Sequence, residues 1–213
     1  MKTILIIGMG EFGKHLAYSL QDLKADVCVV DTDKELINVL SEDFDNAYVA
    51  DCTKDAALKD LGVKAFDVCV VSVGSDLQTS LEITSKLKSM GAKYIIAKAT
   101  NTLQSKFLIM AGANETIYPE KDIASKVAQM CIANNVLDAF VISDKYSVFE
   151  MKVRSEWVGI PLKESKIRSK YNLNVMAVRG NKGIIVPDPE YVFSEEDSVF
   201  LFGKSAVLKK LSK

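Results

Sequence analysis

Residues 2–13 read KTILIIGMGEFG, a short apolar run that leads directly into three glycines spaced as G-x-G-x-x-G. Leu16, Ala17 and Leu20 then recur at helical spacing, so the predicted order is strand, glycine turn and helix. A glycine pattern in that order is typical of a dinucleotide-binding βαβ unit. This stretch therefore predicts a Rossmann-type fold for the first part of the chain.

Each glycine of the pattern has a separate predicted role. Gly8 allows the tight turn, and Gly13 lets the helix pack against the strand. Gly10 lets the backbone approach a phosphate, because any Cβ at that position would collide with it. The helix that follows directs unpaired N–H groups and a partial positive charge at the bound anion. The alternative is a strand–helix turn that binds no ligand.

The next apolar run, residues 27–30, ends at Asp31, which follows Gly10 by about 20 residues, as in dinucleotide-binding units. A carboxylate at that position accepts hydrogen bonds from ribose hydroxyls. It would also repel a 2′-phosphate, so NADP is disfavoured as a ligand.

The composition is that of a soluble globular protein of one or two domains, with 213 residues, 48% of them hydrophobic and 26% charged. A formal net charge of −1 gives no indication of nucleic-acid binding. No apolar run is long enough for a spanning helix, and the chain runs straight into a strand, so no signal peptide is expected. The four cysteines show no metal or redox spacing, which favours a cytoplasmic location.

The first half of the chain alternates between apolar strands and helices, which predicts a doubly wound parallel sheet covered on both faces. The predicted strands are 2–7, 27–30, 47–50, 66–73, 94–97 and 116–118. The predicted helices are one after Gly13, one capped by Asp33, and the ranges 55–61, 77–90, 103–110 and 120–134.

The pattern changes near Val136 to that of a small α+β domain. The predicted strands are 140–142, 147–153, 174–178, 183–186 and 198–202, with short helices at 162–170 and 205–211. The predicted domains are therefore 1–136 and 137–213.

Ligands of open α/β sheets bind at the carboxyl ends of the strands, where the strand order reverses. Asp51 lies at such an end and is expected either to accept a hydrogen bond from adenine or to cap the next helix. Lys98 is expected either to face a phosphate or to be solvated. The predicted site comprises Gly8, Met9, Gly10, Glu11, Phe12, Gly13, Asp31, Thr32, Asp51, Cys52, Thr53, Val73, Gly74 and Lys98.

A catalytic constellation is not recognisable in the sequence. The single histidine, His15, falls in the helix after the glycine loop, and neither a Ser–His–Asp pattern nor a phosphate-binding G-x-x-x-x-G-K-[ST] loop is present. The alternative function, a small NAD-dependent oxidoreductase, would need a proton-transfer group. The last 75 or so residues contain neither His nor Cys.

An ordered set of motifs resembles the RCK (KTN) domain of Trk and Ktr potassium uptake systems. The matching stretches are 8–13, Asp31, Ala-Asp-Cys-Thr (50–53), Val-Ser-Val-Gly (71–74), Ala-Lys-Ala-Thr-Asn (97–101), Gly-Ala-Asn (112–114) and Tyr-Pro-Glu-Lys-Asp (118–122). Gly-Ile-Pro-Leu (159–162), Ile-Arg (167–168) and Asn-Val-Met-Ala-Val (174–178) resemble the partner RCK-C (TrkA-C) domain. The resemblance covers essentially the whole chain.

The resemblance implies a cytosolic, non-enzymatic gating subunit that binds a potassium-translocating protein at the inner face of the membrane. Such subunits form dimers, through a helix that here spans about 122–134, and octameric rings. The implied cofactor is NAD(H), ADP, AMP or ATP, with Glu120 near the nucleotide and able to help hold a divalent cation. Glu11 stands where ATP-responsive members have Arg, so NAD(H), ADP or AMP is favoured over ATP.

The resemblance further implies that the second domain binds cyclic di-AMP. Arg168 is expected to meet phosphate and Asn174 an adenine edge, and the walls are expected from Ile160, Leu162, Ile167 and Val175. A stand-alone nucleotide sensor for another channel or antiporter shares these features and stays open as a further alternative.

Overall fold

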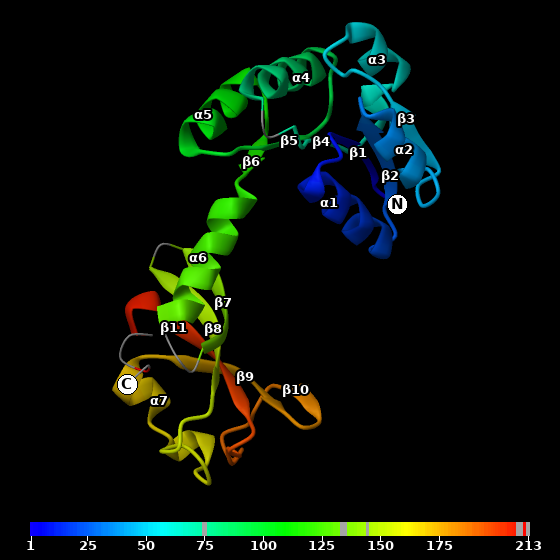
Figure 1. Cartoon of the computed structure of the whole chain (residues 1–213). Coiled ribbons are helices and arrows are strands. Elements are labelled where there is room, and N and C mark those ends of the chain that lie inside the picture. The colour runs from blue at the N-terminus through cyan, green and yellow to red at the C-terminus, as the bar shows by residue number, and fades with distance from the viewer. Residues whose placement is uncertain (74–75, 133–135, 144, 208–210, 212–213) are drawn as a thin grey trace. The chain divides into compact units, whose positions relative to one another are not determined.

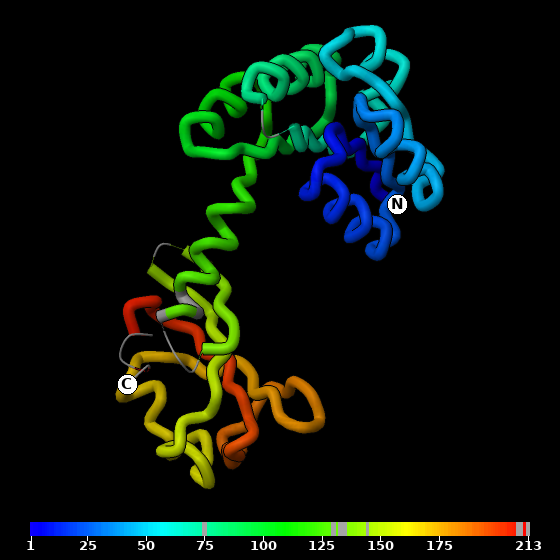
Figure 2. The backbone as a smooth tube through the Cα atoms, viewed as in Figure 1, coloured from blue at the N-terminus to red at the C-terminus, as the bar shows by residue number. Residues whose placement is uncertain are grey.

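The computed structural model describes residues 1–73, 76–132, 136–143, 145–207 and 211. They form two compact units, Met1–Pro119 and Glu120–Lys213 (Figure 1). The backbone passes once from the first unit, blue to green, into the second, green to red (Figure 2). The predicted domain boundary at 136 differs from the boundary between these units, because it assigns the helix after Pro119 to the first domain. It stays a prediction.

The first unit is built on a six-stranded sheet in which every neighbouring pair is parallel. Its strands are β1 (Thr3–Ile7), β2 (Asp26–Asp31), β3 (Asn46–Val49), β4 (Val68–Val71), β5 (Ile95–Lys98) and β6 (Glu115–Ile117). The order β3-β2-β1-β4-β5-β6 reverses direction between β1 and β4, which is the Rossmann arrangement. The predicted doubly wound sheet is confirmed.

Helices cover both faces of this sheet because successive strand residues point to opposite sides. Ile4 and Ile6 of β1 pack in the core beneath α1 (Glu11–Asp22) and α2 (Lys34–Leu40). Leu5 and Ile7 pack in the other core, with residues of the helices α3, α4 and α5. Those elements span Asp55–Asp60, Leu77–Ser89 and Thr102–Ala111, with a 3₁₀ turn, η1, at Val63–Ala65.

The helix caps follow the sequence signals. Asp33 accepts hydrogen bonds from the backbone N–H groups of Glu35 and Leu36 at 2.9 and 3.1 Å, as the sequence predicts for an N-cap. Gly112 takes a left-handed φ of 117° where α5 ends, a conformation that costs glycine little.

The second unit is an antiparallel sheet in the order β10-β9-β11-β8-β7. Its elements are α6 (Pro119–Ile132), β7 (Val136–Ser143), β8 (Tyr146–Lys152), η2 (Leu162–Glu164), α7 (Ile167–Tyr171), β9 (Asn174–Gly180), β10 (Gly183–Ile185), β11 (Ser198–Lys204) and η3 (Ser205–Val207). Trp157, Phe149 and Phe193 are its largest buried side chains. Among the helices that the structure describes, none is long and apolar enough to cross a bilayer.

Three elements of the second unit differ from the prediction. The single helix predicted at 162–170 is wrong: Ser165 Oγ closes a 3₁₀ turn on the Leu162 carbonyl, and Lys166 then takes a left-handed φ of 55° before α7. Strand β7 is longer than the predicted 140–142, because it pairs with β8 along most of its length. The predicted terminal helix begins as the 3₁₀ turn η3, and residues 208–210 lie outside the described part of the chain.

The close approach of Gly13 to β1 gives a first prediction. A Cβ at Gly13 would lie 2.2 Å from the Gly8 carbonyl oxygen, so Gly13→Ala must displace α1 or the glycine loop. We expect this variant to lose about 1–3 kcal/mol of unfolding free energy, as overpacked cores do. Gly10→Ala is the matched control, because φ is −62° there and a Cβ meets nothing within 4 Å. Equal thermal midpoints for the two variants would contradict the packing role of Gly13.

Candidate functional site

A cavity of about 550 Å³ opens at the carboxyl ends of the parallel strands. The glycine loop after β1, where the strand order reverses, forms one wall. The lining residues are Ile7, Gly8, Gly10, Glu11, Phe12, Asp31, Thr32, Ala50, Asp51, Cys52, Ser72, Val73, Thr79, Ile83, Lys98 and Thr100. The cavity therefore lies where open α/β folds bind their ligands.

The three glycines of the loop serve different physical needs. Gly8 has a φ of 95° and lies against the backbone of Ser72 and Val73, so a side chain there would be both strained and crowded. Gly13 has no room for a Cβ because of the Gly8 carbonyl. Gly10, by contrast, faces open space, so the protein itself does not require glycine there. A ligand that approaches the backbone at Gly10 would explain why this position is glycine.

The first turn of α1 offers unused hydrogen-bond donors to this cavity, and a further unpartnered hydroxyl lies buried in its wall. Gly10 is the N-cap of α1 and provides no side-chain cap, so the first turn of a twelve-residue helix keeps N–H groups available to an anion. Ser72 is only 8% exposed, and its hydroxyl has no hydrogen-bond partner within the described residues. Buried polar groups normally have a partner. The first turn of α1 fits a phosphate-bearing ligand, whereas the Ser72 hydroxyl is itself shielded from solvent.

The Asp31 carboxylate is already oriented by the backbone. Its Oδ2 accepts from the Met9 N–H at 2.6 Å, and its Oδ1 accepts from the Asp33 N–H at 3.0 Å. The end of β2 is thereby tied to the glycine loop. The same carboxylate lines the cavity, so the acid predicted to bind ribose also holds the loop that would bind phosphate.

Asp51 is held by the turn that follows β3. Its Oδ1 accepts from the Thr53 N–H at 2.9 Å and from Thr53 Oγ1 at 2.6 Å, and these bonds hold the pKa of the Asp51 carboxyl below its usual value. The N-cap of α3 is Lys54, without a side-chain cap. The structure therefore does not show Asp51 as the helix cap that the sequence left as one alternative.

Charged side chains at the mouth of the cavity have defined neighbours. The exposed Glu11 carboxylate forms an ion pair with Lys14 one turn later, and this hydrogen-bonded contact lowers the pKa of Glu11. Lys98 Nζ lies 5.7 Å from the centre of the Phe12 ring, within the range of a cation–π interaction. Lys14 is thus a cation already placed beside Glu11.

Ten of the predicted site residues line the cavity: Gly8, Gly10, Glu11, Phe12, Asp31, Thr32, Asp51, Cys52, Val73 and Lys98. Met9, Gly13 and Thr53 do not, and the Met9 side chain is fully buried. Gly74 lies outside the described residues, and Glu120 belongs to the second unit. Burial raises the pKa of the Cys52 thiol to about 12, so this thiol is a neutral wall of the cavity.

Ser72 lies in the stretch 71–74 that the sequence placed at a strand end, whereas Thr79 and Thr100, which also line the cavity, were not predicted as site residues. A hydroxyl gives no sequence signal by itself, because its value here comes from where the neighbouring strands place it. Among the described residues, no group of three or more His, Cys, Asp or Glu side chains is placed to hold a metal ion.

A second cavity, of about 500 Å³, lies beside α7 in the second unit. Of the predicted second-ligand residues it is lined by Leu162, Ile167, Arg168, Asn174 and Val175, and Ile160 is not among its lining residues. Lys163 and Lys166 also line it, so the cavity is cationic. Ile167 is only 2% exposed and chiefly serves the core.

The fold and the first cavity define a class of protein: a Rossmann-type domain with a candidate nucleotide site, joined to a small domain built on an antiparallel sheet. The TrkA-N domain family model matches residues 4–119, and the TrkA-C domain model matches residues 148–213. The chain belongs to the TrkA family and is homologous to Ktr potassium uptake proteins.

Curated relatives resemble the chain over nearly its full length. Ktr system potassium uptake protein C of Bacillus subtilis (strain 168) is 32% identical and aligns with 100% of this chain and 96% of its own. Ktr system potassium uptake protein A of the same organism is 30% identical over 98% of this chain and 95% of its own.

Solved structures share the fold at lower identity. The structure described as the GsuK channel bound to NAD superposes with a TM-score of 0.71 at 21% identity, over 100% of this chain and 39% of the channel chain. The GsuK RCK domain gives a TM-score of 0.70 at 21% identity, over 99% of this chain and 47% of its own.

Proposed function

We propose that the chain is a nucleotide-binding regulatory subunit that gates a Trk/Ktr-type potassium uptake system. The observation that carries this proposal is the cavity at the strand ends, where the glycine loop, Asp31 and Asp51 converge. Similarity to Ktr proteins A and C along the whole chain supports it.

The strand order supports an orientation for an adenine nucleotide. β1, β2 and β3 are neighbours, about 4.8 Å apart in such sheets, and end in the glycine loop, Asp31 and Asp51, respectively. A ligand with phosphate at the loop then brings ribose to Asp31 and the adenine amine to Asp51. The β4 and β5 side, with Ser72 and Lys98, takes the remaining part of NAD(H), or solvent with ADP, AMP or ATP.

The ligand acts as an effector, without turnover. A ligand held by the ends of five strands shifts the population of conformations that bind it differently, and this requires no chemical step. The only histidine, His15, is an exposed residue of α1 and does not line the cavity, so the oxidoreductase alternative has no histidine there for proton transfer.

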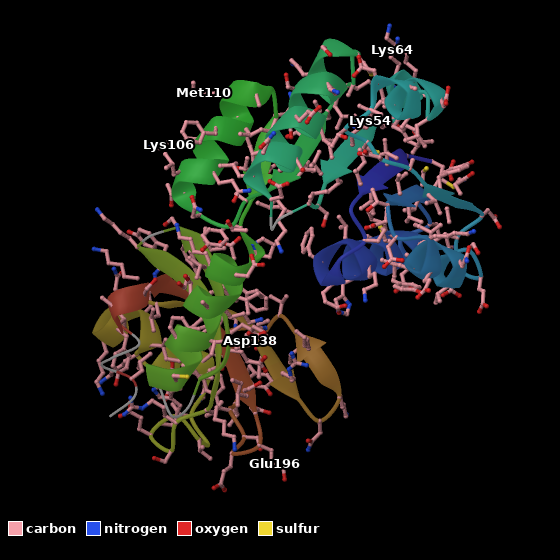
Figure 3. The ribbon with its side chains drawn as sticks, turned by 45° about the horizontal axis from the view of Figure 1, so that its top comes forward. Lys54, Lys64, Lys106, Met110, Asp138 and Glu196 are labelled. Atoms are coloured by element: carbon pink, nitrogen blue, oxygen red, sulfur yellow. The ribbon has the colours of Figure 1, made fainter. Side chains whose placement is uncertain are left out.

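Assembly into dimers and an octameric ring completes the proposal. Ile123 and Val127 on α6 are 59% and 48% exposed, although they form the apolar stripe of that helix. Leu103 and Met110 on α5 are also exposed, and Lys106 and Met110 project outward from this helix (Figure 3). Such faces suit self-association beneath a potassium-translocating membrane subunit at the cytoplasmic side.

Potassium uptake tests the function directly. Cells without their own uptake system would express a Ktr-type membrane subunit alone, with this chain, or with the Gly10→Ala variant. We expect the chain to raise nucleotide-dependent uptake and the variant to lose this effect, and light scattering of the pure protein should give a dimer or larger. NADH consumption with carbonyl substrates, together with no effect on uptake, would instead establish the oxidoreductase.

Nucleotide binding should depend on Gly10 and Asp31. Gly10→Ala places a methyl where phosphate must approach, and Asp31→Ala leaves the ribose hydroxyls unpaired. We expect each to weaken NAD or AMP binding by about tenfold to a hundredfold in calorimetry, the range of a lost charge-assisted hydrogen bond. Asp22→Ala, an exposed acid at the end of α1, is the matched control. Unchanged affinity in both variants would remove the ligand from this loop.

The charge of Glu11 should set the nucleotide preference. In the absence of divalent cations, the wild type is expected to bind NAD(H), ADP or AMP more tightly than ATP, because Glu11 repels a terminal phosphate. Glu11→Arg should raise ATP affinity through a charge-assisted contact, and Glu11→Gln should fall between the two. Tightest wild-type binding of metal-free ATP, measured by calorimetry in a chelator, would show that Lys14 already neutralises this position.

Cyclic di-AMP is the proposed ligand of the second cavity. Lys163, Lys166 and Arg168 supply positive charge for phosphates, Asn174 offers an amide to an adenine edge, and Leu162 and Val175 supply apolar walls.

The full-length chain should bind cyclic di-AMP saturably, and Arg168→Ala should abolish that binding while the thermal midpoint stays unchanged. Lys182→Ala, an exposed cation in the turn before β10, is the matched control. A folded wild-type protein that shows no saturable binding in titration calorimetry would exclude the ligand.

A further inference from the structure

Lys86 on α4 connects that helix to the turn between β3 and α3. Its ammonium group hydrogen-bonds to Glu82 Oε1 and Asp55 Oδ1, each at 2.9 Å, and to the Thr53 carbonyl oxygen. An ammonium group has three N–H donors, so these three acceptors use all of them. The Lys86 side chain is 27% exposed. This half-buried side chain therefore connects a backbone carbonyl of the turn with one carboxylate on α3 and one on α4.

The contacts reach Asp51 through Thr53. Lys86 holds the carbonyl of Thr53, and the N–H and hydroxyl of Thr53 both donate to Asp51 Oδ1. Asp51 lines the cavity, whereas Lys86 and Thr53 do not. Thr53 therefore gives a direct route by which a change at Lys86 can alter the position of the Asp51 carboxylate in the cavity.

The turn is also held by a backbone hydrogen bond from the Lys54 N–H to the Asp51 carbonyl oxygen at 3.0 Å and by the buried Cys52, but few side chains outside it contribute. Helix α3 has six residues and lacks a side-chain cap, and the Lys54–Asp51 ion pair is long, at 3.7 Å, and exposed. Exposed ion pairs of that kind contribute little. Helix α4, by contrast, also supplies Thr79 and Ile83 to the cavity wall, so Lys86 ties the turn to an element that already borders the cavity.

We propose that Lys86 is a positioning residue, which fixes the Asp51 carboxylate so that it accepts a hydrogen bond from the exocyclic amine of an adenine nucleotide. The proposal rests on the proposed nucleotide site and adds the determinant of base specificity. Lys86 acts by restricting the turn, because an acceptor that is already in place loses less conformational entropy when the base arrives.

Two monophosphates that differ by one group test this role. AMP carries the exocyclic amine, and purine riboside 5′-monophosphate lacks only that amine. The wild type should prefer AMP by about tenfold in calorimetry. Lys86→Met should weaken AMP about tenfold and leave the purine riboside nucleotide almost unchanged, so that the preference falls close to one. A general structural role would weaken both ligands equally and leave their ratio unchanged.

Hydrogen exchange measured by mass spectrometry gives an independent readout. Peptides that cover residues 51–55 should exchange faster in Lys86→Met, while peptides from β1 and β2 stay protected. Lys88→Met, an exposed lysine on the same helix, is the matched control and should keep both the exchange pattern and the AMP preference. Lys86→Gln keeps an uncharged hydrogen-bond donor, so it should change the exchange rate and the AMP preference in the same direction as Lys86→Met but to a smaller extent. It replaces Lys86→Met in the experiment if that variant does not fold.

The outcomes separate this proposal from the proposed function. An unchanged AMP preference in Lys86→Met, or a wild type that binds both monophosphates equally, would overturn the role of Lys86 and leave the nucleotide site intact. A wild type that binds neither AMP nor NAD would overturn the nucleotide site itself.

Discussion

The contact between Gly13 and the Gly8 carbonyl fixes the geometry of the first unit. With no Cβ at Gly13, α1 packs so closely on the end of β1 that a methyl would lie 2.2 Å from that oxygen. The start of α1, its uncapped N–H groups and the open space at Gly10 all take their positions from this approach. A helix set further from the sheet would direct its partial positive charge away from the cavity, since this effect acts only within the first turn.

The two carboxylates of the candidate site each serve the fold and the cavity. Asp31 binds the Met9 and Asp33 N–H groups, and Asp51 binds Thr53, so both are oriented before any ligand arrives. Such preorganisation reduces the entropy lost on binding. It also couples Asp31 to the glycine loop. A ligand that hydrogen-bonds to the Asp31 carboxylate competes with the Met9 N–H, whose bond to Asp31 holds that loop. The loop and Asp31, the acid proposed to bind ribose, should therefore respond to a ligand together.

Much of the first unit follows from the sequence, because parallel strands covered on both faces leave unbroken apolar runs and glycine marks the helix ends. The same apolar runs locate the ends of β1, β2 and β3 in the sequence. The residues at these ends make up most of the correctly predicted lining of the cavity. The sequence placed Ser72 at a strand end but could not show that its hydroxyl lacks a partner, since an unpartnered hydroxyl is a property of packing and not of residue type. In the second unit, the left-handed Lys166 that separates η2 from α7 has no glycine or proline signal, so the segment resembled one helix. At Gly10 a Cβ would meet no protein atom within 4 Å, so packing does not require glycine there, and the role predicted from the sequence, room for a phosphate, stays a prediction.

A regulatory ligand needs a differential affinity for two conformations, and the placement of the cavity suits that need. Its walls come from the ends of β1 to β5 and from α4, so a nucleotide contacts segments that lie far apart in the sequence. An effect of 1–3 kcal/mol on such an equilibrium, which is typical of allosteric coupling, corresponds to only one or two well-placed hydrogen bonds. Asp31, Asp51 and the first turn of α1 offer that many in one conformation. If the proposed gating holds, the turns that carry Asp31 and Asp51 are the parts whose position must differ between the two states, because a ligand that met them identically in both would shift nothing.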